Sequence, residues 1–346
     1  MKVEHVTRWA AGSATLGAAA WAALAALAGA GRARLGVIEL LFLFAPLVIV
    51  PLGLELGRVT APVVWLLPED VARIMQPLAA ALAVSSFWFS PSRAAAMLVA
   101  PWVVVCLLVA LAGLRSLFRG KNHSLPAMAA NLGRIDLALA GGWLFVSRLG
   151  LRPLGFQEPI ILLTAVHFHY SGFATALLAG TTVDFARRAG RDSRLLGLVV
   201  ALVVLAPFAL AAGFVLSPVL KLAAALILSL SVMGLAGLML RLVRDLRSGT
   251  ARGFLSVSGA GVVVGMALAG TYALGDALGK DWLLIPRMAS THGVLNALVF
   301  VLPGLLAWLV EWHTNGPISS RETEVSSRHK EAADLWPDRR KVGREV

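Results

Sequence analysis

The chain has 346 residues, of which 58% are hydrophobic and 14% charged, and its formal net charge is +12. A soluble domain carries charge on about a quarter of its residues and cannot hide this much apolar surface, so the composition excludes a water-soluble globular protein. The apolar runs are continuous rather than alternating, which excludes a transmembrane β-barrel. We therefore expect an all-α, polytopic transmembrane helical bundle whose partner is the lipid bilayer.

Ten hydrophobic spans are expected in chain order. They cover residues 9–29, 36–56, 73–90, 94–114, 133–149, 159–181, 195–216, 218–240, 254–274 and 286–310. The first span also fits the apolar core of a signal peptide, because it follows a basic start and ends near small residues. Residues 1–312 thus form the predicted transmembrane domain. Residues 313–346 are charged and serine-rich, and we expect them to form a disordered cytoplasmic tail.

The basic residues favour one orientation. If the N-terminus is cytoplasmic, the inner loops and tail carry 23 Lys and Arg residues and the outer loops carry 8. This asymmetry predicts that both termini are cytoplasmic. It also accounts for the positive net charge without a nucleic-acid partner. Inner arginines, Arg73 and Arg134 among them, are interpreted as topology determinants that contact lipid headgroups. The lone cysteine, Cys106, allows neither a disulfide nor a CxxC metal motif.

Residues 160–180, IILLTAVHFHYSGFATALLAG, place a histidine pair in the middle of an apolar span. Polar groups at that depth are costly and normally face a cavity or a partner. Positions two apart differ by about 200° around a helix, so the two histidines serve different contacts. We expect His167 to face a cavity and His169 to bond across a helix contact, beside small residues that admit a neighbouring helix. The polar stripe on the His167 side comprises Thr164, His167, Tyr170 and Ser171.

A second polar motif occurs in residues 288–300, MASTHGVLNALVF, where His292 and Asn296 are one helical turn apart. In the expected topology His292 lies at a depth compatible with His167. Glu39, near an outer span end, is the expected carboxylate partner for a histidine. Tyr272 and Asp276 are further polar groups expected on that outer side.

Segments 147–180 and 285–300 together resemble the YndJ family of bacterial membrane proteins, with HFHYSGF and THGVLNA as the specific cores. That family is largely uncharacterised, and where it carries a label the label is transporter. The resemblance implies a multi-pass protein of the bacterial inner membrane. It also supports five residues by motif position: His167, His169, Tyr170, His292 and Asn296. It implies no substrate.

Three functions remain open. The first is a transporter or permease in which intramembrane histidines bind a proton or a small solute, since a histidine changes charge near neutral pH. It needs no cofactor, and its expected site comprises His167, His169, Tyr170, His292, Asn296, Thr164, Ser171 and Glu39. The alternative is a metal- or haem-binding redox protein with His167 and His292 as ligands, joined by His169 or Glu39. The third is a lipid-modifying enzyme with a histidine as general base, although no catalytic motif identifies its residues.

Overall fold

The computed structural model describes residues 3–60, 67–119 and 123–315, and these residues form helices joined by short connections. The α-helices are α1 (Val3–Gly29), α2 (Val37–Phe44), α3 (Val50–Thr60), α4 (Leu67–Ser85), α5 (Arg93–Arg119), α6 (Leu125–Leu149), α7 (Ile160–His167), α8 (Thr175–Arg188), α9 (Arg194–Leu216), α10 (Pro218–Leu242), α11 (Gly249–Ala277), α12 (Ile285–Met288) and α13 (Leu302–Asn315). Four π-helical segments join some of them end to end: η1 (Ala45–Ile49), η4 (Phe168–Ala174), η6 (Ala289–Gly293) and η7 (Leu295–Val301). Three 3₁₀ turns complete the set: η2 (Ser86–Trp88), η3 (Pro153–Gly155) and η5 (Val243–Asp245).

These elements form ten long rods, which confirms the predicted all-α transmembrane bundle. Within the described ranges, nine rods are long and apolar enough to cross a membrane. The tenth rod is α6, whose Arg134, Asp136 and Arg148 lower its hydropathy. With 25 residues, α6 is about 37 Å long, which is enough to cross the hydrocarbon core. Its charged residues are buried against other helices, so α6 crosses inside the bundle.

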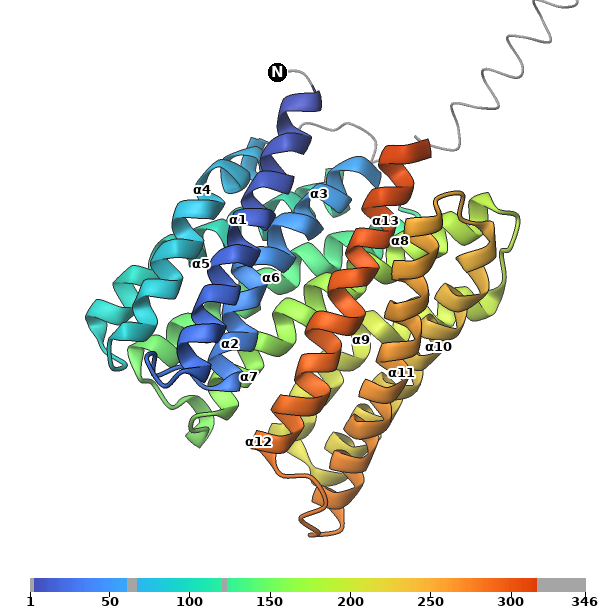
Figure 1. Ribbon diagram of the computed structural model, residues 1–346. Helices are drawn as coiled ribbons and strands as arrows, with labels where there is room; N and C mark the ends of the chain where they lie inside the picture. Colours follow the sequence, from blue (N-terminus) through green and yellow to red (C-terminus); the bar gives the residue numbers. More distant parts are fainter. Residues whose placement is uncertain (1–2, 61–66, 120–122, 316–346) are drawn as a thin grey trace, which may run out of the picture.

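The rods lie roughly side by side, and both ends of the described chain lie at the same end of the bundle (Figure 1). Two composite rods are the most enclosed, each with 72% of its apolar span buried. They are α2–η1–α3 and α7–η4–α8. The centre of the bundle is therefore built by two rods that contain π-helical segments in their middle, and the second of these carries the histidine pair.

Several helix ends have clear local causes. Pro218 begins α10, where its missing N–H is not needed, and the Ser217 hydroxyl accepts from the Leu220 N–H at 3.5 Å. Gly150, with a φ of 77°, ends α6 in the left-handed conformation that glycine adopts without strain. At the start of α11 the Glu311 carboxylate accepts the Arg247 N–H at 3.0 Å, which ties α13 to α11.

Some predicted boundaries are wrong in the same direction. The third span was expected from residue 73, but α4 begins at Leu67. The fifth was expected from residue 133, but α6 begins at Leu125. Glu69, Arg73 and Arg134 look like loop residues in the sequence, yet in the fold they are buried and paired. The last rod ends at Asn315, three residues past the expected domain boundary, and the rest of the predicted tail, residues 316–346, lies outside the described residues.

The first helix packs on the second rod. The Trp21 indole N–H donates to the Leu40 carbonyl at 2.8 Å, and the Ser13 hydroxyl donates to Gln76 of α4 at 2.9 Å. At Gly17 a Cβ atom would lie 1.9 Å from the Leu47 carbonyl oxygen, so only glycine allows this approach. Helix α1 thus meets two neighbouring rods through specific polar and backbone contacts.

Candidate functional site

Both polar motifs of the sequence overlap π-helical segments, and His167 is the last residue of α7, directly before η4. The segment η4 contains Phe168–Ala174, and η6 and η7 contain His292 and Asn296. At the end of η4 the Thr175 N–H and hydroxyl both donate to the Tyr170 carbonyl, five residues earlier, which is the π-helical register. Such segments are rare overall but frequent at functional sites, so the backbone geometry of these two rods, which the α2–η1–α3 rod shares, supports a functional site among them.

A cavity of about 310 Å³ lies between the α7–η4 rod, α9, α10, α11 and the α12–η6–η7 rod. Most of its wall is apolar. Six of the eight residues expected at the site line it: Thr164, His167, Tyr170, Ser171, His292 and Asn296. His169 and Glu39 are not among the lining residues. The fold therefore brings together two motifs that are about 125 residues apart in the sequence.

The two cavity histidines are each held by a backbone carbonyl. His167 is exposed to the cavity, and its Nδ1 lies 2.9 Å from the Leu163 carbonyl. In His292, Nδ1 lies 2.8 Å from the carbonyl of Gly265 on α11. A ring nitrogen beside a carbonyl oxygen carries the hydrogen, so each neutral ring keeps an unprotonated Nε2. The Asn296 amide nitrogen lies 3.0 Å from both ring nitrogens of His292, and because Nδ1 carries the hydrogen, the amide donates to Nε2.

The other lining hydroxyls of the polar stripe are already engaged. The Tyr170 hydroxyl donates to the Leu41 carbonyl on α2 at 2.8 Å. The Thr164 hydroxyl donates to Ile160 in its own helix at 2.8 Å. Tyr170 therefore ties the cavity wall to the other central rod, while Ser171 lines the cavity beside it.

His169 lies on the opposite side of η4 from the cavity and is fully buried. Its Nε2 accepts from the indole N–H of Trp102 on α5 at 3.3 Å, and its Nδ1 lies 2.8 Å from the Ala165 carbonyl. The ring is stacked on Trp102, with 6.0 Å between centroids, and meets Phe42 edge-on. This is the contact across helices that the two-residue spacing predicts, and it leaves His169 no access to the cavity.

Glu39 contacts the start of its own helix and not a cavity histidine. Its carboxylate accepts the N–H of Gly36 at 2.9 Å in the first turn of α2, where negative charge is favoured. The structure thus separates Glu39 from the cavity histidines. Across the described residues, no three His, Cys, Asp or Glu side chains gather as a metal-binding group. His167 and His292 alone are fewer than the three or four protein ligands usual for zinc.

At one end of the cavity the Lys221 ammonium pairs with the Asp276 carboxylate at 2.7 Å. Lys221 also lies over the Phe214 ring, 5.2 Å from its centroid. Tyr272 lines the same end. The sequence indicated Tyr272 and Asp276 as polar groups on this side but not the pairing with Lys221.

Comparison with known proteins assigns the family. Residues 40–300 match the profile described as YndJ-like protein. The chain belongs to the YndJ-like family. The matched stretch runs from α2 to η7 and includes every lining residue of the cavity except Val301. The chain is also 29% identical over 210 residues to the "Uncharacterized membrane protein YndJ" of Bacillus subtilis (strain 168).

The alignment with that relative covers 61% of this chain and 38% of the relative. No solved structure matches the chain. The family and the helices together identify a multi-pass membrane protein with a bacterial homologue.

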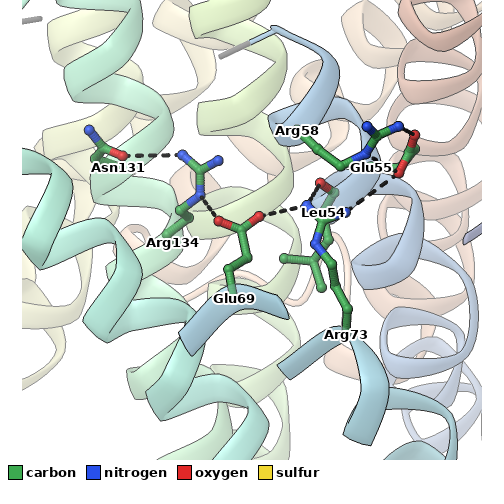
Figure 2. Close-up of polar contacts among 7 residues, drawn as sticks. All are labelled: Leu54, Glu55, Arg58, Glu69, Arg73, Asn131 and Arg134. Atoms are coloured by element: carbon green, nitrogen blue, oxygen red, sulfur yellow. Dashed lines mark hydrogen bonds and ion pairs between the residues drawn. The ribbon is translucent and has the colours of Figure 1, made fainter. Parts of the chain in front are cut away.

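This YndJ-like chain also contains a buried ion network, at the end of the bundle where α3 ends and α4 begins. Figure 2 shows Glu69 between Arg73 and Arg134, with contacts of 2.7 and 3.4 Å. Arg73 continues to Glu55 at 3.5 Å, and Glu55 also binds Arg58. The four residues other than Arg58 are each at most 6% exposed.

This network was not predicted from the sequence. Arg73 and Arg134 were expected to be topology determinants that contact lipid headgroups, and the headgroup contact is wrong because both side chains are buried in ion pairs. One signal was present: Glu69 and Arg73 have the i,i+4 spacing of a helical ion pair. The link from α4 to Arg134 on α6 has no sequence signal, since it depends on how the helices pack.

Asp136 is a second missed residue. It is 1% exposed on α6, and neither carboxylate oxygen has a hydrogen-bond partner among the described residues. It packs against η4, where a Cβ on Gly172 would lie 2.8 Å from the Asp136 Cβ. An acidic residue inside a predicted span was a usable signal. Its place behind the cavity wall was not readable from the sequence.

The environment of Asp136 predicts that a neutral side chain of the same shape is tolerated. A charged carboxylate without a donor is costly to bury, whereas an amide avoids the charge. We expect Asp136→Asn to change the free energy of unfolding by less than about 1 kcal/mol, measured by titration of detergent-purified protein with SDS. A loss of more than about 2 kcal/mol would indicate that the carboxylate makes a contact that an amide cannot replace.

Proposed function

We propose that this chain is a permease that binds a small solute in the histidine-lined cavity. The observation that carries the proposal is the convergence of His167, His292 and Asn296, from two distant spans, on one cavity inside the bundle. Transporters bind their solutes at interrupted helices deep in the membrane. Here both rods that supply these residues contain π-helical segments at the cavity. The proposal requires no metal or cofactor.

The two ends of the bundle differ in a way that suits alternating access. The cavity reaches the end where α10 begins and α11 ends, and Lys221 and Asp276 lie there. The buried ion network lies at the other end, where α3 ends and α4 begins, and the two ends of the described chain lie at that end as well (Figure 1). If both termini are cytoplasmic, as the basic residues favour, the cavity faces the outside and the network closes the inside.

The test uses cysteine labelling, because the only natural cysteine, Cys106, is fully buried. Ser171→Cys places a thiol on the cavity wall, and Ala176→Cys places one at a buried position (1% exposed) as the matched control. Each variant is reconstituted in vesicles and treated with a maleimide that does not cross membranes, added to one side at a time. We expect Ser171→Cys to react from either side and Ala176→Cys from neither.

Labelling of Ser171→Cys from one side only would contradict a permease. The alternative, a metal- or haem-binding redox protein, would then be tested by an optical spectrum and metal analysis of the wild-type protein and the His167→Ala variant. Labelling of the control at the same rate as the cavity cysteine would show that the helices open non-specifically, which also contradicts the proposed site.

A further inference from the structure

The charges on the cavity wall neutralise each other. Of the lining residues, all of which are described, the formally charged ones are Lys221 and Asp276, and these two form an ion pair at 2.7 Å. A charged ligand would have to break this pair or remain unpaired in an otherwise apolar site, which is costly. The wall therefore favours an uncharged ligand with a large apolar surface.

Most hydroxyl groups on the cavity wall already donate their hydrogen to a carbonyl oxygen of the protein. The hydroxyls of Thr164, Thr175 and Ser229 donate to backbone carbonyls at 2.8, 2.9 and 2.8 Å. The Tyr170 hydroxyl donates to Leu41 at 2.8 Å. These groups can accept a further hydrogen bond but have no hydrogen left to give to a ligand.

Asn296 adds a buried acceptor. Because Nδ1 of His292 donates to the Gly265 carbonyl, its Nε2 must accept, and so the amide nitrogen of Asn296 faces the ring. The amide oxygen of Asn296 is left buried with no hydrogen-bond partner among the described residues. The oxygen lies against α11, where a Cβ on Gly265 would be 3.2 Å from it. A buried acceptor without a donor is costly, and a ligand donor that the Asn296 side chain turns to meet would remove that cost.

His167 adds a second acceptor. Its Nδ1 donates to the Leu163 carbonyl at 2.9 Å, so the neutral ring has a lone pair on Nε2. The side chain is exposed to the cavity. Asn296 Oδ1 and His167 Nε2 lie on two different rods and are both acceptors. Each of them thus requires a hydrogen-bond donor from a ligand.

We infer that the cavity takes an uncharged, largely apolar molecule that carries a hydrogen-bond donor such as a hydroxyl, with the donor bound by Asn296 Oδ1 or His167 Nε2. The inference rests on the proposed function in that it takes this cavity as the solute site. A volume of about 310 Å³ with an apolar wall and a few convergent polar groups is within the range of small-molecule sites.

The experiment compares probes that share one apolar skeleton and differ in one group. These are 2-adamantanol, which can donate, 2-adamantanone, which only accepts, and 2-adamantylammonium and 2-adamantanecarboxylate, which are charged. Binding is measured by equilibrium dialysis against nanodiscs that contain the protein, with empty nanodiscs subtracted for partition into lipid. We expect the alcohol to bind at least about tenfold more tightly than the ketone and than either charged probe.

Two variants test the assignment of the acceptors. Asn296→Leu and His167→Phe each remove one acceptor, and we expect at least one of them to bring the alcohol-to-ketone ratio down to within about threefold of unity. Because His167 is exposed to the cavity, His167→Phe provides a test even if Asn296→Leu does not fold. Ser231→Ala, which alters a buried hydroxyl of α10 away from the cavity, is the control and should leave the ratio unchanged.

The outcomes separate this inference from the proposed function. Equal binding of alcohol and ketone, or tighter binding of a charged probe, overturns the inferred ligand class even if cysteine labelling supports a permease. Selective binding of the alcohol that both acceptor variants leave intact overturns the assigned atoms. Selective binding that the variants abolish, together with one-sided labelling, supports the ligand class while contradicting transport.

Discussion

Replacing Glu69 with alanine is expected to lower the free energy of unfolding by about 3 to 5 kcal/mol. Glu69 is buried between two arginines, 2.7 Å from Arg73 and 3.4 Å from Arg134. Without it, Arg134 keeps no carboxylate among its described neighbours, and a buried charge without a counter-ion is far more costly than one exposed to water. The decrease is measured by SDS titration of the purified protein, followed by circular dichroism.

Asp192→Ala is the matched control for this prediction. Asp192 pairs with Arg187 at 3.3 Å, but its side chain is 66% exposed, so its removal should cost less than about 1 kcal/mol. A double variant, Glu69→Ala with Arg134→Leu, should recover part of the stability because it removes the unpaired cation as well. Equal destabilisation by Glu69→Ala and Asp192→Ala would show that the network is open to water and is not a buried closure of the bundle.

Replacing Trp102 with alanine is expected to cost about 3 to 5 kcal/mol, because it empties the volume of a fully buried indole. Trp102→Phe separates packing from hydrogen bonding. It keeps most of the ring but leaves Nε2 of His169 without its donor, and we expect a cost of about 1 to 3 kcal/mol. Since His169 lies off the cavity, alcohol binding by Trp102→Phe should match that of the wild-type protein.

The control for packing is Trp88→Ala, at a side chain that is 58% exposed, which should cost less than about 1 kcal/mol. If Trp102→Phe is as stable as the wild-type protein, the hydrogen bond to His169 contributes nothing to stability. If instead Trp102→Phe weakens binding of the alcohol tenfold without unfolding, His169 acts on the cavity through η4, and the separation of the two histidines is wrong.

Much of the candidate site follows from helical spacing. His167 and His169 are two residues apart, and this alone directs them to opposite sides of the helix. The π-helical geometry of η4 was not predicted, because helical spacing carries no signal for it, and neither was the close packing of its Gly172 against Asp136 of α6. Glu39 was expected to pair with a histidine only because both lie at a similar depth in the membrane. Depth does not show which face of the bundle a residue occupies.

The sequence by itself determined the fold class and the number of rods. A continuous apolar segment in lipid must satisfy its own backbone hydrogen bonds, and a helix does so within the segment, without reference to any neighbour. The same reasoning found the polar spans, because a histidine or asparagine inside such a segment is visible without knowing its partner.

Only the tertiary structure decided which polar groups meet. Tyr170 donates to Leu41, 129 residues away, and His169 accepts from Trp102, 67 residues away. Arg134 resembled a topology residue until α4 brought Glu69 beside it. Such pairings depend on how rods rotate and pack against one another, and helical periodicity specifies only the face of a residue on its own rod. For that reason the convergence of the polar motifs on one cavity and the ion network became visible only in the assembled bundle.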